Sequence, residues 1–386
     1  MANGVLIGAL EFYGDATKYS GDPGTITNPY CISDRRDLRT VSSTITTPSN
    51  YILTDNIDFY DHCVAAESGF VITLDESFDF NGFCFRNLNI AGVITDSGYR
   101  RLSIVFDMGT TPTNKDKHIR GLYLVNFIYN NSIRNCIVEF RDSSSSFNGK
   151  VYLYNTEVNL TLIHHSSSAS DDEDCAMLFN NELNSSAVII FKDTLIRLSG
   201  REEWSGDDGD KYYHNLFAKK YDDISGFYFY NLHVDYNNFK IVIVGSSTDY
   251  LCLFPKVDFS DCTVYTGNFT VEVGVKHTAN KSNWGLQLID NGTNYSSPNM
   301  INTIINCNVS LVSENPNVTN PTATIAYTHA SSIPCLFINK EKFGSNISFS
   351  DYSYDPQFYF INDEQVRDPI YLSSLGLLIS DNGKLL

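Results

Sequence analysis

The chain has 386 residues and a formal net charge of −18 at pH 7. This acidity argues against nucleic acid and anionic membranes as partners, because their phosphates would be repelled. The composition also argues against a membrane-spanning helix, since no apolar run approaches the roughly 20 residues that a span requires. Apolar residues mostly alternate over four to eight positions, which is typical of half-buried strands and predicts an all-β protein.

The first 29 residues differ from the rest because they are rich in Gly and small polar residues and carry no repeated phrase. We interpret residues 1–29 as an N-terminal arm that attaches the protein to a partner, and a simply disordered segment is the alternative. The start Met1-Ala2-Asn3-Gly4 lacks basic residues, and the apolar stretch at 5–10 is too short for a secretory signal. We therefore expect synthesis in a cytoplasm without standard export.

Residues 30–92 are expected to hold a capping helix and the first coils of the fold. The stretch Ser33 to Val41 predicts a short helix, with Ser33 or Asp34 as its N-cap. A solenoid exposes backbone and core at its open end, so a short amphipathic helix is a suitable cap.

A short phrase recurs along the chain: apolar–x–apolar–x–Asn/Asp–x–x–apolar. Each copy predicts two very short strands with a polar corner between them, and such units must stack to bury their apolar faces. At equivalent corners, Asn and Asp side chains can hydrogen-bond one another and the neighbouring backbone. The nine corner positions are Asn87, Asn126, Asn135, Asn155, Asp193, Asn231, Asp261, Asn306 and Asp351.

The segments Tyr51 to Phe59 and Phe78 to Ile90 carry a resemblance to a known fold. Their order, after a short helix, is similar to the opening coils of adhesins with GLUG-type repeats and of bacteriophage fibre and tailspike proteins. Phe80 stands where those repeats usually have Gly. The resemblance implies a right-handed single-stranded parallel β-helix (a solenoid) with a short capping helix and a non-helical N-terminal arm.

The remaining coils are expected in a β-helix body at 93–355. Residues 356–386 contain the apolar stretch Asp368 to Ile379, which we interpret as a C-terminal cap or a subunit contact. The nine cysteines include no Cys-x-x-Cys pair and lie mostly in apolar phrases, so we expect buried free thiols rather than disulfides.

Acidic clusters are the best candidates for chemistry in the sequence. Paired carboxylates would suit glycoside hydrolysis, but charge runs in Gly/Ser loops are usually only solvated. Asp207, Asp208 and Asp210 have the oxygen density for calcium without the EF-hand spacing, so they are a weak calcium candidate. No catalytic residue, metal site or cofactor is predicted, and enzymatic activity stays open.

Aromatic side chains could bind sugars, because the C–H faces of sugar rings suit π surfaces. Core packing or subunit contacts are the alternative explanation for an aromatic-rich chain. The candidates for stacking on a glycan are Trp204, Trp284, Tyr212 and Tyr213.

The resemblance favours a structural protein of a tailed-bacteriophage virion, a head or tail fibre or spike that binds host surface polysaccharide. Bias toward Asn, Ile, Tyr and Phe suggests an AT-rich genome, as in crAss-like gut phages. The expected partners are two further copies of the chain in a homotrimer, and a capsid or tail protein contacted through residues 1–29. A tailspike depolymerase and a bacterial surface adhesin are the alternatives.

Overall fold

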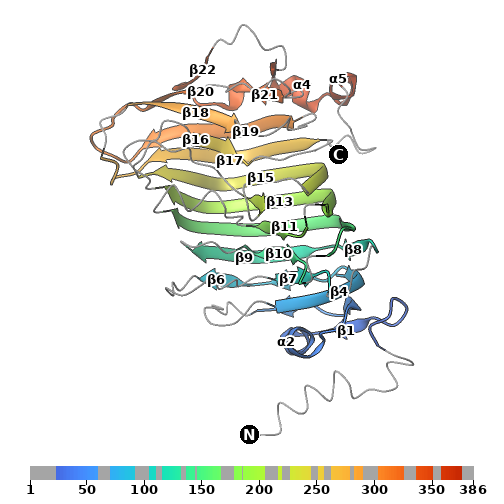
Figure 1. Cartoon of the computed structure of the whole chain (residues 1–386). Coiled ribbons are helices and arrows are strands. Elements are labelled where there is room, and N and C mark those ends of the chain that lie inside the picture. The colour runs from blue at the N-terminus through green and yellow to red at the C-terminus, as the bar shows by residue number, and fades with distance from the viewer. Residues whose placement is uncertain are drawn as a thin grey trace.

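The computed structural model describes residues 23–59, 70–91, 104–109, 115–131, 136–143, 146–166, 178–184, 186–204, 216–219, 227–244, 251–255, 262–278, 282–289, 303–325, 336–350 and 358–375. In these residues the protein is all-β, and strand stacks on strand from the N-terminal to the C-terminal end (Figure 1). One sheet has 19 strands and a second has four in this part of the chain. Every pairing between the named strands of these ranges is parallel. The prediction of an all-β, solenoid-like fold is confirmed.

The elements follow one another along the stack in chain order. The first part comprises β1 (Tyr30–Ile32), α2 (Arg35–Thr44), β2 (Ser49–Leu53), β3 (Ile57–Asp58), β4 (Phe70–Asp79), β5 (Phe85–Arg86), β6 (Asn89–Ala91), β7 (Ile104–Asp107), β8 (Lys117–Arg120), β9 (Tyr123–Asn131) and β10 (Val138–Arg141). The middle comprises β11 (Lys150–Ser166), β12 (Phe179–Glu182), β13 (Val188–Trp204), β14 (Phe217–Lys219), β15 (Phe227–Ile243), β16 (Leu251–Phe254) and β17 (Thr263–Val273). The last part comprises β18 (Asn283–Ile289), β19 (Thr303–Ser313), β20 (Thr322–Ile325), β21 (Leu336–Asn339), the 3-10 turn η1 (Lys340–Lys342), β22 (Ile347–Phe349), β23 (Phe358–Ile361), α4 (Asp363–Arg367) and α5 (Pro369–Ser374).

Long and short strands alternate in the middle of the stack. The long strands β11, β13 and β15 have 17 residues each and pair in sequence, while the short strands β10, β12 and β14 pair on another side of the coil. Each long strand passes through a corner instead of ending there, so the prediction of two very short strands per phrase is wrong at these coils. Because successive corners bend alike, the hydrogen-bond ladder continues on both sides of the bend.

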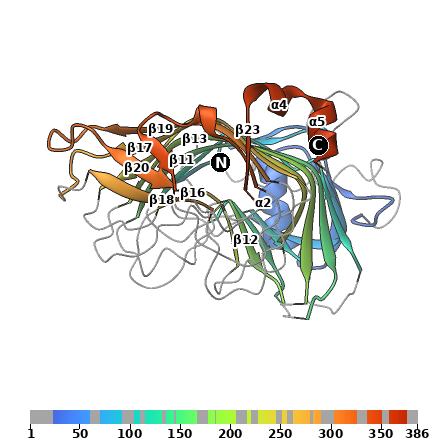
Figure 2. The same cartoon turned by 90° about the horizontal axis from the view of Figure 1, so that it is seen from above.

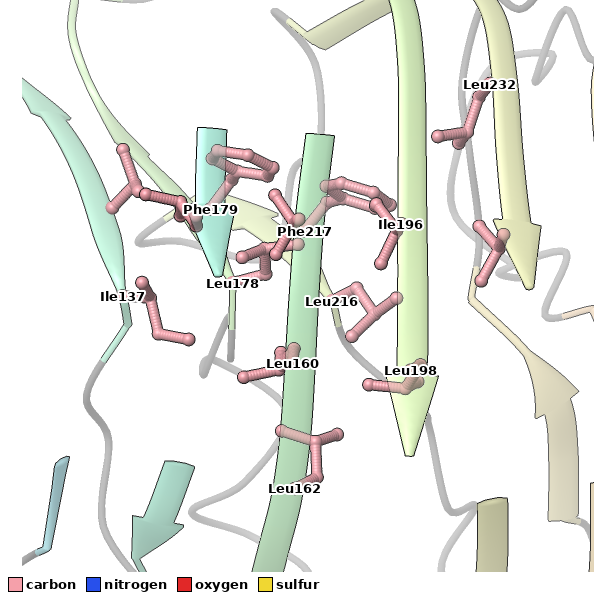
Figure 3. Close-up of a cluster of buried hydrophobic side chains, with 14 of the residues drawn as sticks. Ile137, Leu160, Leu162, Leu178, Phe179, Ile196, Leu198, Leu216, Phe217 and Leu232 are labelled. Carbon is pink, nitrogen blue, oxygen red and sulfur yellow. The ribbon is translucent and has the colours of Figure 1, made fainter. Parts of the chain in front are cut away.

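The core is made by side chains that point inward from successive coils. Their alternation is clear in β15, where buried and more exposed residues follow each other along most of the strand. Phenylalanine rings stack along the axis: Phe179 lies 6.0 Å from Phe217 with an interplanar angle of 3°. Figure 3 shows Phe179 and Phe217 among the aliphatic side chains of neighbouring coils, including Ile137, Leu160 and Leu198. This continuous core is what single coils could not form alone.

The predicted capping helix is confirmed as α2. Asp34 is its N-cap and accepts hydrogen bonds from the backbone N–H groups of Arg36 and Asp37. Leu38 and Val41 are buried in the main core, so the helix closes the N-terminal end of the stack. Residues 23–29 also contact this end, since the Asn50 backbone N–H donates to the Gly24 carbonyl.

The C-terminal helices occupy a different position. The view along the stack shows α2 beneath the coils and α4 and α5 at the periphery (Figure 2). Leu372 of α5 joins a separate apolar cluster with the outward-facing residues Val264, Ile304 and Phe337. The helices therefore cover part of the outer sheet face, while Phe360 of β23 remains 47% exposed at the end of the core.

The described cysteines are free thiols, and none of the helices in these ranges is long and apolar enough to cross a bilayer. The segment 278–300 is rich in Asn, Ser and Gly, a composition typical of loops, yet it contains the strand β18. Its residues Trp284, Leu286 and Leu288 alternate and are buried, which is the pattern of a strand.

Candidate carbohydrate-binding surface

Four neighbouring strands place a band of aromatic and cationic side chains on the outer face of the sheet. In β11, Val151 and Leu153 point inward and are buried, so Tyr152 and Tyr154 point outward. The register then aligns the outward side chains of the strands on either side. We call this set the tyrosine surface: His118 and Arg120 of β8, Tyr152 and Tyr154 of β11, Lys192 of β13, and Tyr228 and Tyr230 of β15.

The centre of the tyrosine surface is an ordered ring stack. The His118 and Tyr152 ring centroids lie 5.4 Å apart with an interplanar angle of 10°, and Tyr154 stacks on Tyr152 at 6.0 Å. The Lys192 Nζ lies 5.3 Å from the Tyr152 ring centroid and 5.5 Å from that of Tyr154. These contacts hold the rings and the ammonium group in fixed positions, which lowers the entropy lost when a ligand binds.

Two groups of the surface are available to a ligand. Tyr230 is 42% exposed, and its ring makes no ring contact with other described residues. Arg120 is exposed beside Tyr154 in the register. An aromatic face next to hydroxyl and guanidinium donors is the combination that sugar rings require for stacking and hydrogen bonding.

Histidine 118 contributes a neutral imidazole near pH 7. Burial lowers its pKa below the usual 6.5, and the neighbouring Arg120 adds to this effect, whereas Asp116 opposes it. The Tyr154 hydroxyl lies 3.4 Å from His118 Nδ1. Burial also raises the pKa of Tyr154, so that hydroxyl stays protonated and can donate.

A second histidine lies on the outer face of β15. His233 Nε2 is 2.8 Å from the Thr266 hydroxyl, which donates to the Asp235 carboxylate at 3.0 Å. Because that hydroxyl donates its proton to Asp235, it accepts a hydrogen bond from the Nε2–H group of His233. Burial lowers the pKa of His233, although Asp235 opposes the effect.

We expect the free energy of unfolding to fall as the pH drops below about 6.5. Both His118 and His233 have a lowered pKa in the folded protein, so in this range the unfolded chain binds more protons than the folded one. The stabilisation that comes from keeping these two imidazoles neutral is therefore complete above the unfolded pKa, and it is lost as the pH falls through the lower pKa of the folded state. Urea unfolding at pH 7 and pH 5 measures the effect, and the double variant His118→Gln/His233→Gln should lose less stability over this interval. An equal pH dependence in the variant and the natural chain would contradict the assignment.

The predicted corner residues that the structure describes are largely at bends. Asn87, Asn126, Asn155, Asp193 and Asn231 all have left-handed backbone conformations, with φ between 53° and 66°. Asn and Asp tolerate this region better than other non-Gly residues. The sequence pattern therefore marked positions with a specific backbone requirement.

Side chains of neighbouring corners are hydrogen-bonded in two ladders. The Asn126 amide donates to Asn87 at 2.8 Å, and Asn87 donates to Asp58 at 3.0 Å. In the second ladder Asn231 donates to Asp193 at 2.9 Å. These contacts join residues of successive coils.

Of the four other predicted corners, one has a different backbone conformation and three lie outside the described residues. Asn306 does not have a left-handed backbone; it lies in β19 in register with Thr266 and accepts a hydrogen bond from the Asn339 amide at 2.9 Å. Its phrase lacks one apolar position, which explains the wrong placement. Asn135, Asp261 and Asp351 lie outside the described residues.

Replacing Asn231 with Leu is expected to cost about 2 kcal/mol of stability, from a strained left-handed backbone and a lost hydrogen bond. The matched control is Asn231→Gly, which accepts positive φ and loses only the side-chain bond, so it should cost roughly half as much. Thermal and urea unfolding measure both changes, and glycan binding should stay unchanged. Loss of binding at full stability would instead make this corner part of a site.

The predicted glycan-stacking residues do not form the tyrosine surface. Trp284 is only 1% exposed, so the prediction of a stacking role for it is wrong. Trp204 ends β13 in register with Ile243, and its side chain is not described. Tyr212 and Tyr213 lie outside the described residues, as do the calcium candidates Asp207, Asp208 and Asp210. No group of three or more His, Cys, Asp or Glu residues in the described ranges is placed to hold a metal.

The signal for the tyrosine surface is present in the repeated phrases themselves. Both variable positions before the corner are Tyr in Val151 to Asn155 and again in Phe227 to Asn231. The register between the two phrases, with β13 between them, brings these positions to one face. No family model, curated protein or solved structure was found to match the chain.

Proposed function

We propose that this chain is a right-handed single-stranded parallel β-helix that binds a cell-surface polysaccharide through the tyrosine surface. The observation that carries the proposal is the ordered band of outward Tyr, His, Arg and Lys side chains on β8, β11, β13 and β15. A polymeric ligand lying across the coils would meet a strand about every 4.8 Å. The exposed Tyr230 ring offers a stacking face, and the neighbouring hydroxyl and guanidinium groups offer donors.

Binding is favoured over hydrolysis by the composition of the surface. Glycosidases generally use two carboxyl groups placed on either side of the scissile bond. The seven side chains of the tyrosine surface include no carboxylate. A protein that holds a polysaccharide without cutting it fits this set of groups.

We further propose that the chain is a fibre or spike protein of a tailed-bacteriophage particle, assembled as a homotrimer. The resemblance of residues 51–90 to fibre and tailspike coils supports this assignment. Attachment to a capsid or tail protein is assigned to residues 1–29, on the basis of their Gly-rich and polar composition. Three solenoids packed side by side would bury lateral surface and resist unfolding.

A glycan array tests the binding function, and an assay for new reducing ends or unsaturated products tests hydrolysis and lyase cleavage on the same ligands. We expect retention on one polysaccharide class with no cleavage product. Cleavage would establish a depolymerase, and absence of binding across surface polysaccharides would contradict the proposal.

Gold-labelled antibody on purified particles tests the location of the protein. Label on the head or tail would support the virion assignment, whereas particles that are accessible but unlabelled would favour a surface adhesin.

A further inference from the structure

We propose that the ligand of the tyrosine surface is an acidic polysaccharide whose carboxylates are bound by Arg120 and Lys192. This inference rests on the proposed function and names its ligand class. Arg120 and Lys192 flank Tyr154 on the two neighbouring strands, β8 and β13. Their side chains are the two cationic groups of the tyrosine surface.

Neither cation forms an ion pair with a described carboxylate, although Asp79 of β4 lies in register with Arg120. The chain has 45 acidic and 27 basic residues, so carboxylates are abundant and the net charge repels polyanions at long range. Salt at about 0.15 M screens that repulsion beyond roughly 8 Å, so the local cations decide whether a ligand carboxylate is held. Ion pairs among the described residues hold Arg86 to Asp58, Lys115 to Glu76 and Lys240 to Glu272. None of the ion pairs in the described part of the chain includes Arg120 or Lys192.

Both charges lie on strands that a polymer running across the coils would cross, and that of Lys192 is also held in place. The Lys192 ammonium is positioned over the Tyr152 and Tyr154 rings, at 5.3 and 5.5 Å from their centroids. Arg120 and Lys192 are two strands apart, which places their Cα atoms roughly 10 Å from each other. A chain of sugars running across β8, β11 and β13 could therefore present one carboxylate to each cation.

The chemistry of the two cationic groups also favours a carboxylate ligand. A guanidinium presents a planar fork that matches a carboxylate with two hydrogen bonds, and an ammonium acts as a compact point charge. Neutral sugars use hydroxyl groups, which would leave both charges without a partner of opposite sign. Two cations that form no ion pair with a described residue, beside a stacking ring, thus favour uronic or other carboxylated sugars.

The experiment compares natural acidic polysaccharides with their carboxyl-reduced counterparts, which keep the same backbone and lose the charge. The probes are an array of such matched pairs, tested against the natural chain, Arg120→Gln/Lys192→Gln and the control Arg197→Gln. Arg197 is a partly exposed cation on β13 that is ion-paired with Glu157. Circular dichroism and urea unfolding establish that each variant is folded.

We expect binding to the acidic member of a pair, at least tenfold weaker binding to its reduced form, and a similar loss in the double variant but not in Arg197→Gln. Equal binding to both members would overturn the acidic ligand and leave the glycan-binding function intact. Acid-selective binding that survives in the double variant would overturn the assignment to Arg120 and Lys192. Binding to no member would contradict both this inference and the proposed function.

Discussion

Replacing Gly267 with Ala is expected to lower the free energy of unfolding by about 2–5 kcal/mol, the sum of a strained left-handed backbone and an overpacked contact. Gly267 lies in β17 with φ +89°, and an added Cβ would lie 2.1 Å from the Tyr236 carbonyl oxygen of the adjacent strand. The obstructing atom is backbone in a stacked coil, so relief requires the ladder itself to shift. Urea unfolding followed by circular dichroism measures the loss.

Gly82 provides the matched control for this substitution. It has a similar positive φ of +80°, but an added Cβ there would meet nothing within 4 Å. Gly82→Ala should therefore cost only the backbone strain, about 1–2 kcal/mol. Equal losses of stability in Gly267→Ala and Gly82→Ala would contradict the close approach of Gly267 in β17 to the Tyr236 carbonyl in β15.

Replacing Phe191 with Ala is expected to cost about 3–5 kcal/mol, which is usual for removing a buried aromatic ring. Phe191 is fully buried in β13 and lies 4.7 Å from the Phe229 ring and 4.9 Å from the Phe179 ring. The Phe191 ring of β13 packs against rings of β12 and β15, so its loss leaves a cavity that rigid neighbours cannot fill.

The strands in which Phe191→Ala increases amide hydrogen exchange distinguish a solenoid from a globular core. Each coil contacts only its neighbours, so Phe191→Ala should raise amide hydrogen exchange most in the strands that contact it, such as β12, β13 and β15. Phe191→Leu retains most of the volume and should show a smaller change of the same kind. A uniform rise in exchange from β2 to β21 would contradict nearest-neighbour stacking.

Much of the fold could be predicted because its requirements are local. Left-handed corners favour Asn and Asp, and this preference made Asn155 and Asn231 visible in the sequence. An N-cap next to a short amphipathic run likewise marked α2. The continuation of strands through the corners was missed because it depends on the ladder with neighbouring coils, which a single phrase does not contain.

The candidate site could not be predicted because it depends on register. His118, Tyr152, Lys192 and Tyr230 belong to four separate strands, and only the stacking of coils brings them together. The sequence drew attention to Trp284 because tryptophan is a common sugar-stacking residue. Its alternation with Leu286 was the better indicator, since it placed the ring in the core.

The most direct test of the account is the effect of Tyr230→Ala on affinity for the polysaccharide found on the array. Tyr359→Ala is the control, because Tyr359 is also on the sheet, is 45% exposed, and lies on β23 away from the tyrosine surface. Loss of the stacking contact between the Tyr230 ring and a sugar, about 1–1.5 kcal/mol, predicts a roughly fivefold or greater loss of affinity for Tyr230→Ala and an unchanged affinity for Tyr359→Ala. Equal affinities for the natural chain and Tyr230→Ala would show that the ligand binds elsewhere on the solenoid.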